Sequence, residues 1–374
     1  MIYFDFSATT PLSRLSLEAF SEASTLYFGN ANSTHDLGAQ AKALINQASR
    51  VVLDYLQIDN PNYQMIYTSG ATESNNLALK GAARANAHHG KHIITTRFEH
   101  PSVLAPLSEL QKEGFEVEFA ELNEHGVVDL EALRRMLRKD TILVSVQAVN
   151  SEVGTIQPIG EIFAISHTHA PHCVVHTDAS QAVGKIPPLF ALADLISFSG
   201  HKIYGPKGIG VLMMHTSVTL TPQITGGHSW SPLRAGTPPV PLIHALAASL
   251  LDLKIHAKQD QEDVVQFRTL LLQELRQSPS IVVNSPSPSV PHILNISQLG
   301  YSSQSTVDYL NSKGFAVSAY SACSSGAESS AVVQFLTNDE QRARSSFRIS
   351  LSHMNTEEEV RQLAKALLDR GALS

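Results

Sequence analysis

The chain has 374 residues, with 27 Lys and Arg against 34 Asp and Glu, which gives a formal charge of −7 at pH 7. With 43 % hydrophobic and 16 % charged residues it can bury a substantial core, so the composition excludes a disordered chain. The acidic excess leaves no basic stripe and no polybasic run, and we expect neither nucleic acid nor a membrane as a direct partner.

The chain shows no sign of export. No stretch approaches the ~20 apolar residues of a membrane-spanning helix. Residues 1–7 carry an early acid and no basic n-region, which is not typical of a secretory signal. Two cysteines, Cys173 and Cys323, are too few for a disulfide framework. We therefore expect a cytoplasmic protein.

Short apolar, β-branched runs alternate with segments of helical period between about residues 45 and 215. This alternation predicts an α/β fold with a mostly parallel sheet covered on both faces. Ligands of such sheets bind beyond the carboxyl ends of the strands, so the polar residues that follow each run are the candidates for a site. The runs are 65–68, 92–96, 141–146, 173–177, 195–198 and 209–214.

A Pro-rich stretch at 231–241 precedes a long segment of helical period at about 242–277. We interpret it as the hinge between two domains. The expected large domain covers residues 15–245, and the expected smaller α+β domain combines residues 1–14 with 246–374.

A phosphate-binding turn is the first candidate site. The run at 65–68 is followed by Ser69-Gly70-Ala71-Thr72 and then by a helix-compatible pattern. Gly70 permits a tight turn, Thr72 is a good N-cap, and the free N–H groups of a helix start bind anions. An ordinary capped helix start has the same pattern, so this motif alone does not establish a site.

An acid and a lysine follow two later strands. Asp178 directly follows the run at 173–177. An unpartnered carboxylate in this largely apolar setting is costly, so it needs a cationic partner. Lys202 lies on a Gly-flanked loop after the run at 195–198. A lysine in such a place forms a Schiff base when desolvation and neighbouring positive charge lower the pKa of its ammonium group.

One cofactor accounts for all three features. Pyridoxal phosphate needs a lysine for its aldehyde, an acid for its ring nitrogen and a helix N-terminus for its phosphate. A nucleotide-phosphate enzyme is the competing interpretation.

At this point the sequence resembles the cysteine desulfurases of the NifS/IscS type, which are class V aminotransferases of the fold-type-I pyridoxal phosphate enzymes. The most specific block is the Ser-Gly-His-Lys segment that ends at Lys202, followed by Tyr-Gly-Pro. The matching segments run nearly end to end: 5–11, 28–30, 68–76, 99–100, 149–154, 178–181, 197–202, 234–237, 321–323 and 346–350.

The resemblance implies a large domain with a seven-stranded sheet, and it implies roles for the candidate residues. Lys202 would hold the cofactor aldehyde and move the substrate Cα proton, Asp178 would pair with the ring nitrogen, and His100 would stack on the ring and act as an acid or base. Arg348 would bind the substrate carboxylate. Gln181 and Asn150 would contact the ring hydroxyl. The phosphate would be held by Ala71, Thr72, Ser199 and His201, and the substrate pocket would include Asn30 and Asn150.

The resemblance also implies partners. Thr237 would reach the phosphate in a neighbouring subunit, so we expect a homodimer with shared sites. The expected substrate is L-cysteine. A sulfur-acceptor protein, either an iron–sulfur scaffold or a thiolation enzyme, would take the product sulfur.

Cys323 is the candidate nucleophile. It lies in the small, polar stretch 318–330, which indicates a mobile surface loop. As a thiolate it would take the sulfur of cysteine, release alanine and retain a persulfide. Cys173 begins an apolar run and is expected to be a buried small hydrophobe.

Two alternatives stay open at the level of sequence. A selenocysteine lyase or another lyase on the same fold would not need Cys323, and an inactive scaffold would need none of these residues. The His-rich segment 167–176 also resembles a metal site. We expect no metal there, because a helix end, a Pro loop and a strand direct these side chains apart.

Overall fold

The computed structural model describes residues 1–58, 61–227, 230–319 and 328–371. Its largest sheet has seven strands in the order β2-β8-β7-β6-β5-β3-β4. Strands β3 to β7 pair in parallel, and β8 is antiparallel to β2 and β7, so the prediction of a mostly parallel sheet is confirmed. The strands are β2 (Tyr63–Thr68), β3 (His92–Thr95), β4 (Glu116–Phe119), β5 (Thr141–Ser145), β6 (Val174–Asp178), β7 (Leu195–Ser199) and β8 (Gly210–His215).

The sequence analysis missed one strand of this sheet, the edge strand β4. Its residues alternate between Glu116 and Glu118 on one side and Val117 and Phe119 on the other, so no continuous apolar run marks it. The strand pairs with β3 alone, and an edge strand with one wet face needs only such alternation.

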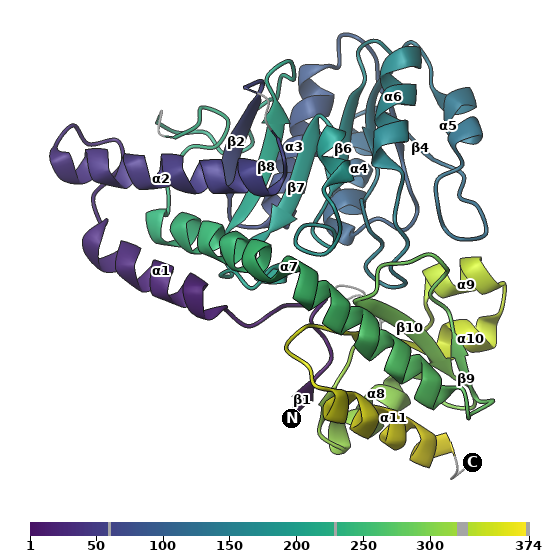
Figure 1. Ribbon diagram of the computed structural model, residues 1–374. Helices are drawn as coiled ribbons and strands as arrows, with labels where there is room; N and C mark the ends of the chain where they lie inside the picture. Colours follow the sequence, from purple (N-terminus) through teal and green to yellow (C-terminus); the bar gives the residue numbers. More distant parts are fainter. Residues whose placement is uncertain (59–60, 228–229, 320–327, 372–374) are drawn as a thin grey trace.

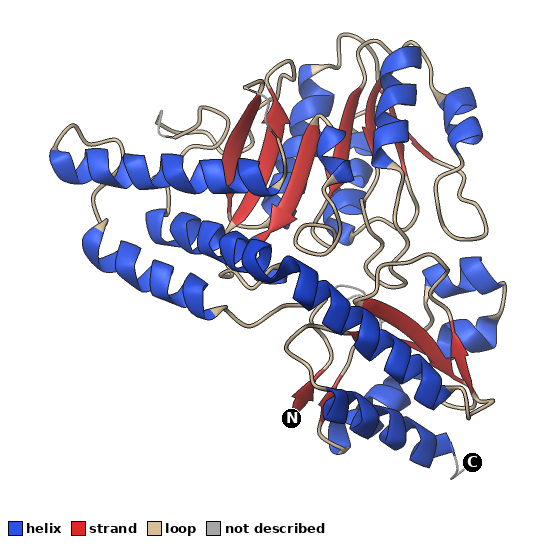
Figure 2. Cartoon of the chain, in the orientation of Figure 1, coloured by secondary structure: helices blue, strands red, loops and turns tan. Residues whose placement is uncertain are grey.

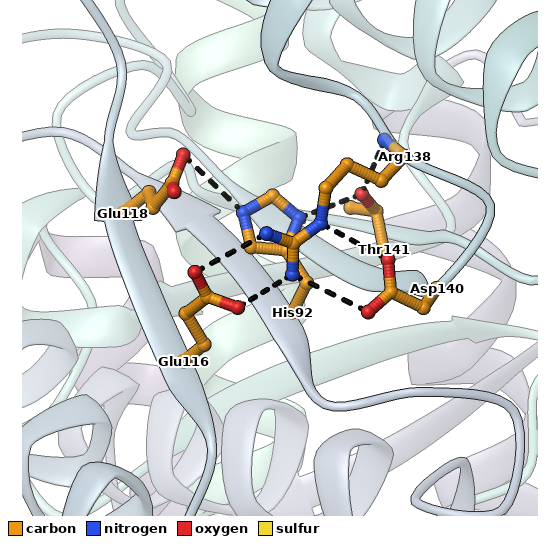
Figure 3. A network of polar contacts seen from close by, with 6 residues as sticks. All are labelled: His92, Glu116, Glu118, Arg138, Asp140 and Thr141. Atoms are coloured by element: carbon orange, nitrogen blue, oxygen red, sulfur yellow. Dashed lines mark hydrogen bonds and ion pairs between the residues drawn. The ribbon is translucent and has the colours of Figure 1, made fainter.

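A network of charged and polar side chains joins the amino ends of β3, β4 and β5 (Figure 3). Arg138 donates to Glu116 at 2.6 Å and to Asp140 at 3.0 Å, and His92 Nδ1 lies 2.8 Å from the hydroxyl of Thr141. His92, Glu116 and Thr141 are the first residues of their strands. The network therefore joins the three strands at the end of the sheet opposite to the carboxyl ends.

Helices cover both faces of the sheet (Figures 1 and 2). Ile45, Ile162 and Leu250 of α2, α6 and α7 belong to the core on one face, and Leu77 and Leu107 of α3 and α4 to the core on the other. The apolar side chains of each buried strand divide between these two cores, as the sequence predicts. The helices of this part of the chain are α1 (Arg14–Leu26), α2 (Asp36–Tyr55), α3 (Ala71–Ala85), α4 (Pro101–Lys112), α5 (Leu130–Met136) and α6 (Ile159–His169).

The second part of the molecule has its own core around a three-stranded antiparallel sheet of order β12-β10-β9. Phe347 of β12, Leu294 of β10 and Leu363 of α11 all belong to this core. The elements are β9 (Ile281–Val283), β10 (Ile293–Gln298), α8 (Ser303–Ser312), β11 (Phe315–Ala316), α9 (Ala331–Thr337), α10 (Glu340–Ser345), β12 (Ser346–Ser350) and α11 (Glu357–Gly371).

Helix α7 (Val240–Leu275) connects the two parts without a break. Its first half contributes Leu246 to the core of the large sheet, and its second half contributes Leu271 to the core of the small sheet. Because the helix runs through residue 245, no sharp boundary lies there, and the expected domain limits stay a prediction.

Contrary to the sequence expectation, α7 is long and apolar enough to cross a membrane by length and composition. Helices α1, α2 and α11 pack along it. Its buried apolar side chains include Leu246, Leu250 and Leu271, whereas Leu251, Ile255 and Val265 are exposed. Buried core helices of globular proteins meet the same criterion.

The N-terminal segment belongs spatially to the second part of the molecule (Figure 1). Strand β1 (Ile2–Tyr3) pairs in parallel with β11, and Phe4 is fully buried in the core of the small sheet. From there the chain runs back to the carboxyl ends of the large sheet, where Ser7 and Ala8 lie.

Gly210→Ala is expected to destabilise the fold. A Cβ at Gly210 would lie 2.5 Å from the Cα of Gly70, at the point where β2 turns into α3. Overpacking of this kind costs about 1–3 kcal/mol. Urea unfolding should show this loss, whereas the control Gly227→Ala, which meets nothing within 4 Å, should unfold like the unmodified chain. Equal stability of the two variants would contradict the prediction.

Candidate active site

Nine predicted site residues line one cavity of about 200 Å³ at the carboxyl ends of the large sheet. A second cavity, of about 400 Å³, contains only Lys202 among the predicted residues. We therefore assign the smaller cavity as the candidate active site. The nine residues are Ala71, Thr72, His100, Asp178, Gln181, Ser199, His201, Lys202 and Arg348.

The start of α3 forms the anion-binding end of this cavity. The N-cap of α3 is Gly70, and no side chain of the helix caps it, so the prediction that Thr72 is the N-cap is wrong. The hydroxyl of Ser199, at the end of β7, accepts the Ala71 N–H at 2.7 Å instead. Thr72 lies in the first turn and lines the cavity.

Lys202 is held by the N-terminal segment. Its ammonium group donates to the carbonyl oxygens of Ser7 at 2.5 Å and Ala8 at 2.7 Å. The neighbouring His201 accepts the backbone N–H of Thr10 on its carbonyl oxygen at 2.9 Å. Burial, and then the positive charge of Lys202, lower the pKa of His201 to about 4.

The carboxylate of Asp178 receives hydrogen bonds from two sides. The backbone N–H of Ser180 donates to Oδ1 at 2.9 Å, and the side-chain amide of Asn75 donates to Oδ2 at 2.8 Å. The buried carboxylate therefore has neutral donors, where the sequence analysis expected a cation. Asn75 was given no role from the sequence. It lies one helical turn after Ala71 in α3, and that spacing is the signal that could have found it.

His100 caps α4 with its own side chain. Its Nδ1 accepts the backbone N–H of Ser102 at 3.1 Å and lies 2.7 Å from the hydroxyl of Ser102. Burial lowers the pKa of His100, as does Lys202, against the opposing effect of Asp178. The imidazole is thus fixed in place and favoured in its neutral form.

Gln181 is oriented by a second lysine. Lys185 donates to the Gln181 side-chain oxygen at 2.8 Å, which directs the amide nitrogen of Gln181 to other partners. That nitrogen donates to the carbonyl of Ser7 at 2.9 Å, which leaves its second hydrogen for a ligand. Burial lowers the pKa of Lys185 well below its usual value, and the nearby Lys202 adds to this effect.

Arg348 is almost fully buried, with 1 % of its side chain exposed. Its guanidinium donates to Asp5 at 2.9 Å and to the carbonyl of Ser151 at 2.8 Å. The sequence analysis did not identify Asp5 as its partner, because 343 residues separate the two in the chain.

Glu99 lies behind His100 and is fully buried. One carboxyl oxygen accepts from the hydroxyl of Thr96 at 2.7 Å and from the N–H of Gln147 at 2.9 Å, and the other has no partner among the described residues. Burial raises the pKa of Glu99 to about 8, and Asp178 adds to this effect. Burial therefore favours the protonated form of this carboxyl group.

Cys323 lies outside the described residues, but both ends of the segment that carries it are anchored beside the cavity. Ser318 exchanges two backbone hydrogen bonds with Arg348, at 2.7 and 3.3 Å. On the other side, the hydroxyl of Ser330 donates to Glu152 at 2.6 Å. Both anchors lead to the turn at 151–152, whose Ser151 lines the cavity.

Asn150 is outside the cavity lining. Its side-chain oxygen accepts the N–H groups of Glu152 at 2.9 Å and Val153 at 3.0 Å, and it borders a different, small cavity. The turn at 150–153 uses the carboxamide that the sequence analysis assigned to cofactor and substrate. A direct contact of Asn150 with cofactor or substrate stays a prediction.

Asn30 and Thr237 are exposed and do not line the cavity of this chain. The Asn30 side chain accepts the N–H of Asn32 at 3.0 Å. The pocket role of Asn30 and the reach of Thr237 into a neighbouring subunit stay predictions.

The histidine side chains of the segment 167–176 contact different partners. His167 pairs with Asp194 at 2.9 Å, His172 stacks on His89 at 3.7 Å between ring centres, and His176 lies 2.9 Å from the Ser145 hydroxyl. Over the described ranges, no group of three potential metal ligands comes together.

Cys173 is buried, as predicted. Desolvation raises the pKa of its thiol far above the usual value. A thiol with so little thiolate is a poor nucleophile.

The donor set of the cavity fits pyridoxal phosphate. The hydroxyls of Ser7 and Ser180 line the cavity and, within the described part of the chain, have no hydrogen-bond partner. The helix N-terminus at Ala71 fits a phosphate, Asp178 a protonated ring nitrogen and Lys202 an aldehyde. The site thus defines a class of enzyme that binds this cofactor at the carboxyl edge of a parallel sheet.

Comparison with known families agrees with this geometry. The model of the family "Aminotransferase class-V" matches residues 2–363, and the chain belongs to this family, specifically to its cysteine desulfurase branch.

Individual relatives cover nearly the whole chain. A protein named cysteine desulfurase IscS, from Vibrio atlanticus, is 38 % identical over 96 % of this chain and 90 % of its own length. The human cysteine desulfurase is 38 % identical over 96 % of this chain and 79 % of its own length. A solved structure of a NifS-like protein covers all of both chains with a TM-score of 0.92 and 33 % identity.

Glu99→Gln is expected to change how stability depends on pH. The folded pKa of about 8 lies above the ordinary value of 4.5, so the folded chain holds a proton that the unfolded chain releases. The stabilisation is present below pH 4.5 and is lost as the pH rises toward 8, by at most about 1.4 kcal/mol per pH unit.

The amide of the Glu99→Gln variant does not titrate, so this loss should disappear. Free energies of urea unfolding at pH 5, 6.5 and 8 measure it. Parallel pH dependences for the unmodified chain and the variant would show that Glu99 holds no such proton.

Proposed function

We propose that this chain is a pyridoxal phosphate-dependent cysteine desulfurase, which converts L-cysteine to L-alanine and retains the sulfur as a persulfide on Cys323. The observation that carries the proposal is the convergence of Lys202, Asp178, His100 and Arg348 on one cavity. A solved structure titled "SspA in complex with cysteine", with a TM-score of 0.81 and 29 % identity, adds support for the substrate.

Lys202 and the residues around it would hold the cofactor. Its amine would bind the aldehyde, the first turn of α3 with Ser199 would hold the phosphate, and Asp178 would keep the ring nitrogen protonated. When bound, pyridoxal phosphate supplies a sink for the electron pair released at the substrate Cα.

The chain's own groups carry out the remaining tasks. The guanidinium of Arg348 binds the substrate carboxylate, while Asp5 and Ser151 hold it in position. The amine of Lys202 takes the proton from the substrate Cα and returns one to the product. The neutral imidazole of His100 lies against the same cavity and supplies or removes a proton there.

Sulfur transfer balances with Cys323 as the acceptor. The Cys323 thiolate attacks the substrate sulfur, the Cβ–S bond breaks and an S–S bond forms. The Cβ carbon, now alanine's methyl group, gains a proton, so that cysteine and a thiol become alanine and a persulfide. The anchoring of Ser318 and Ser330 next to the cavity supports this assignment.

The assembly around this enzyme is also part of the proposal. We expect a homodimer in which Thr237, exposed in the single chain, reaches the phosphate site of the neighbouring subunit. The persulfide sulfur would pass to an acceptor protein, either an iron–sulfur scaffold or a thiolation enzyme, in the cytoplasm.

Cys323→Ser is expected to retain the cofactor and lose sulfur transfer. Alanine formation from L-cysteine, with reductant present, should fall by at least about a hundredfold, because serine is not a comparable sulfur nucleophile. Mass spectrometry should find the persulfide on Cys323 of the unmodified enzyme. Cys173→Ala is the matched control and should retain both activity and persulfide.

The same assay separates the alternatives. Undiminished alanine formation in Cys323→Ser would identify a lyase that needs no protein persulfide, and selenocysteine is then the substrate to test. Lys202→Ala should lose both the cofactor absorbance and alanine formation. Unchanged cofactor absorbance in that variant would refute the assignment of Lys202.

A further inference from the structure

A continuous chain of hydrogen bonds connects Asp178 to His100 inside the protein. The Asn75 amide nitrogen lies 2.8 Å from Asp178 Oδ2 and 2.9 Å from the Ser102 hydroxyl oxygen. That hydroxyl oxygen lies 2.7 Å from His100 Nδ1. Asn75 is fully buried, and Ser102 is 8 % exposed.

The chemistry of the groups determines the direction of each bond. The carboxylate of Asp178 only accepts, so the amide of Asn75 must present its nitrogen to it. Both hydrogens of that nitrogen are then used, one for Asp178 and one for Ser102. Since the Ser102 oxygen accepts from Asn75, its own hydrogen is available for His100 Nδ1.

His100 Nδ1 receives a second donor, the backbone N–H of Ser102, at 3.1 Å. A nitrogen that accepts two hydrogen bonds carries no proton, so the neutral imidazole carries its proton on Nε2. The opposite tautomer would direct an N–H at the backbone N–H of Ser102 and lose this bond.

The two hydrogen bonds donated by Asn75 leave the oxygen of its side chain without a donor among the described residues. This oxygen is buried. An unsatisfied buried acceptor is destabilising. The unsatisfied acceptor accompanies the orientation in which both amide hydrogens of Asn75 are directed to Asp178 and Ser102.

We propose that Asn75 and Ser102 are positioning residues, which orient the Asp178 carboxylate and hold His100 in the tautomer protonated on Nε2. The inference deepens the proposed desulfurase function and rests on it for its catalytic meaning. Neither residue has to touch substrate. Each acts through Asp178 or His100. One shared network therefore holds both the carboxylate assigned to the ring nitrogen and the imidazole assigned to proton transfer.

Ser102→Ala removes one donor to Nδ1 and should raise the pKa of His100, because that donor favours the neutral imidazole. Among the described residues, the charged groups that act on His100 are Asp178 and Lys202, and Glu99 is its neighbour in the sequence. All of them are unchanged in the variant. The expected rise is about half a pH unit or more. Ser102→Thr keeps the hydroxyl and should retain the original value.

Nitrogen NMR of the cofactor-loaded full chain, labelled with ¹⁵N-histidine, reads the tautomer and the pKa directly. His100→Asn identifies the signal by its loss. The expected result is a proton on Nε2 in the unmodified enzyme and a raised pKa in Ser102→Ala alone. A proton on Nδ1, or identical titrations for Ser102→Ala and Ser102→Thr, would overturn the proposal.

A double-mutant cycle tests the connection through Asn75. Asn75→Ala and Ser102→Ala should each lower kcat for alanine formation more than they change KM, and their combined effect should be smaller than the product of the two. Independent effects would show that the residues do not act as one network. If the unmodified enzyme forms no alanine from cysteine, the desulfurase assignment fails, and the NMR result still decides the tautomer.

Discussion

The burial of one guanidinium group determines how the parts of this molecule meet. A charge taken out of water is costly unless it is paired and hydrogen-bonded. Arg348 lies on β12 of the small sheet, and its partners are Asp5 of the N-terminal segment and Ser151 of the turn after β5. Satisfying it therefore brings three distant segments to one place. That place is the cavity at the carboxyl ends of the large sheet, which Arg348 and Ser151 line.

The same arginine sets the position of the chain that leads to Cys323. The backbone of Arg348 is bonded to Ser318, and Glu152 in the adjacent turn holds Ser330. A substrate carboxylate bound by Arg348 would therefore lie next to both anchors of the nucleophile segment. Under the proposed function, recognition of the substrate and delivery of the thiol would depend on one set of contacts.

The sequence could predict the features that follow from strand order. Asp178 and Ser199 end neighbouring parallel strands, so their meeting at one edge follows from the pattern of apolar runs and from the rule for such sheets. Asn75 and Ser102 could not be predicted in the same way. Their contact depends on how α3 and α4 are rotated against each other, and a helical pattern records only which residues are apolar. The ligand contact of Asn150 stays a prediction, since the turn at 150–153 uses its side-chain oxygen.

Burial keeps several titratable groups of the site neutral. Burial favours the protonated form of Glu99 and the neutral forms of His100 and His201. The charges that remain belong to groups with an assigned partner, such as the Arg348 guanidinium with Asp5. The electrostatic field in the cavity is consequently determined by few charged groups. Because the dielectric constant of a buried site is low, removing any one of these groups changes the field strongly.

The pairing of β1 with β11 has a consequence for the protein during its synthesis. All seven strands of the large sheet have been made once residue 215 leaves the ribosome, whereas Ile2 pairs with Phe315. Domains fold as units while the chain is still growing. A nascent chain that ends before residue 315 can therefore complete the cofactor-binding sheet. It would still expose Ile2 and Phe4, whose partners have yet to be translated.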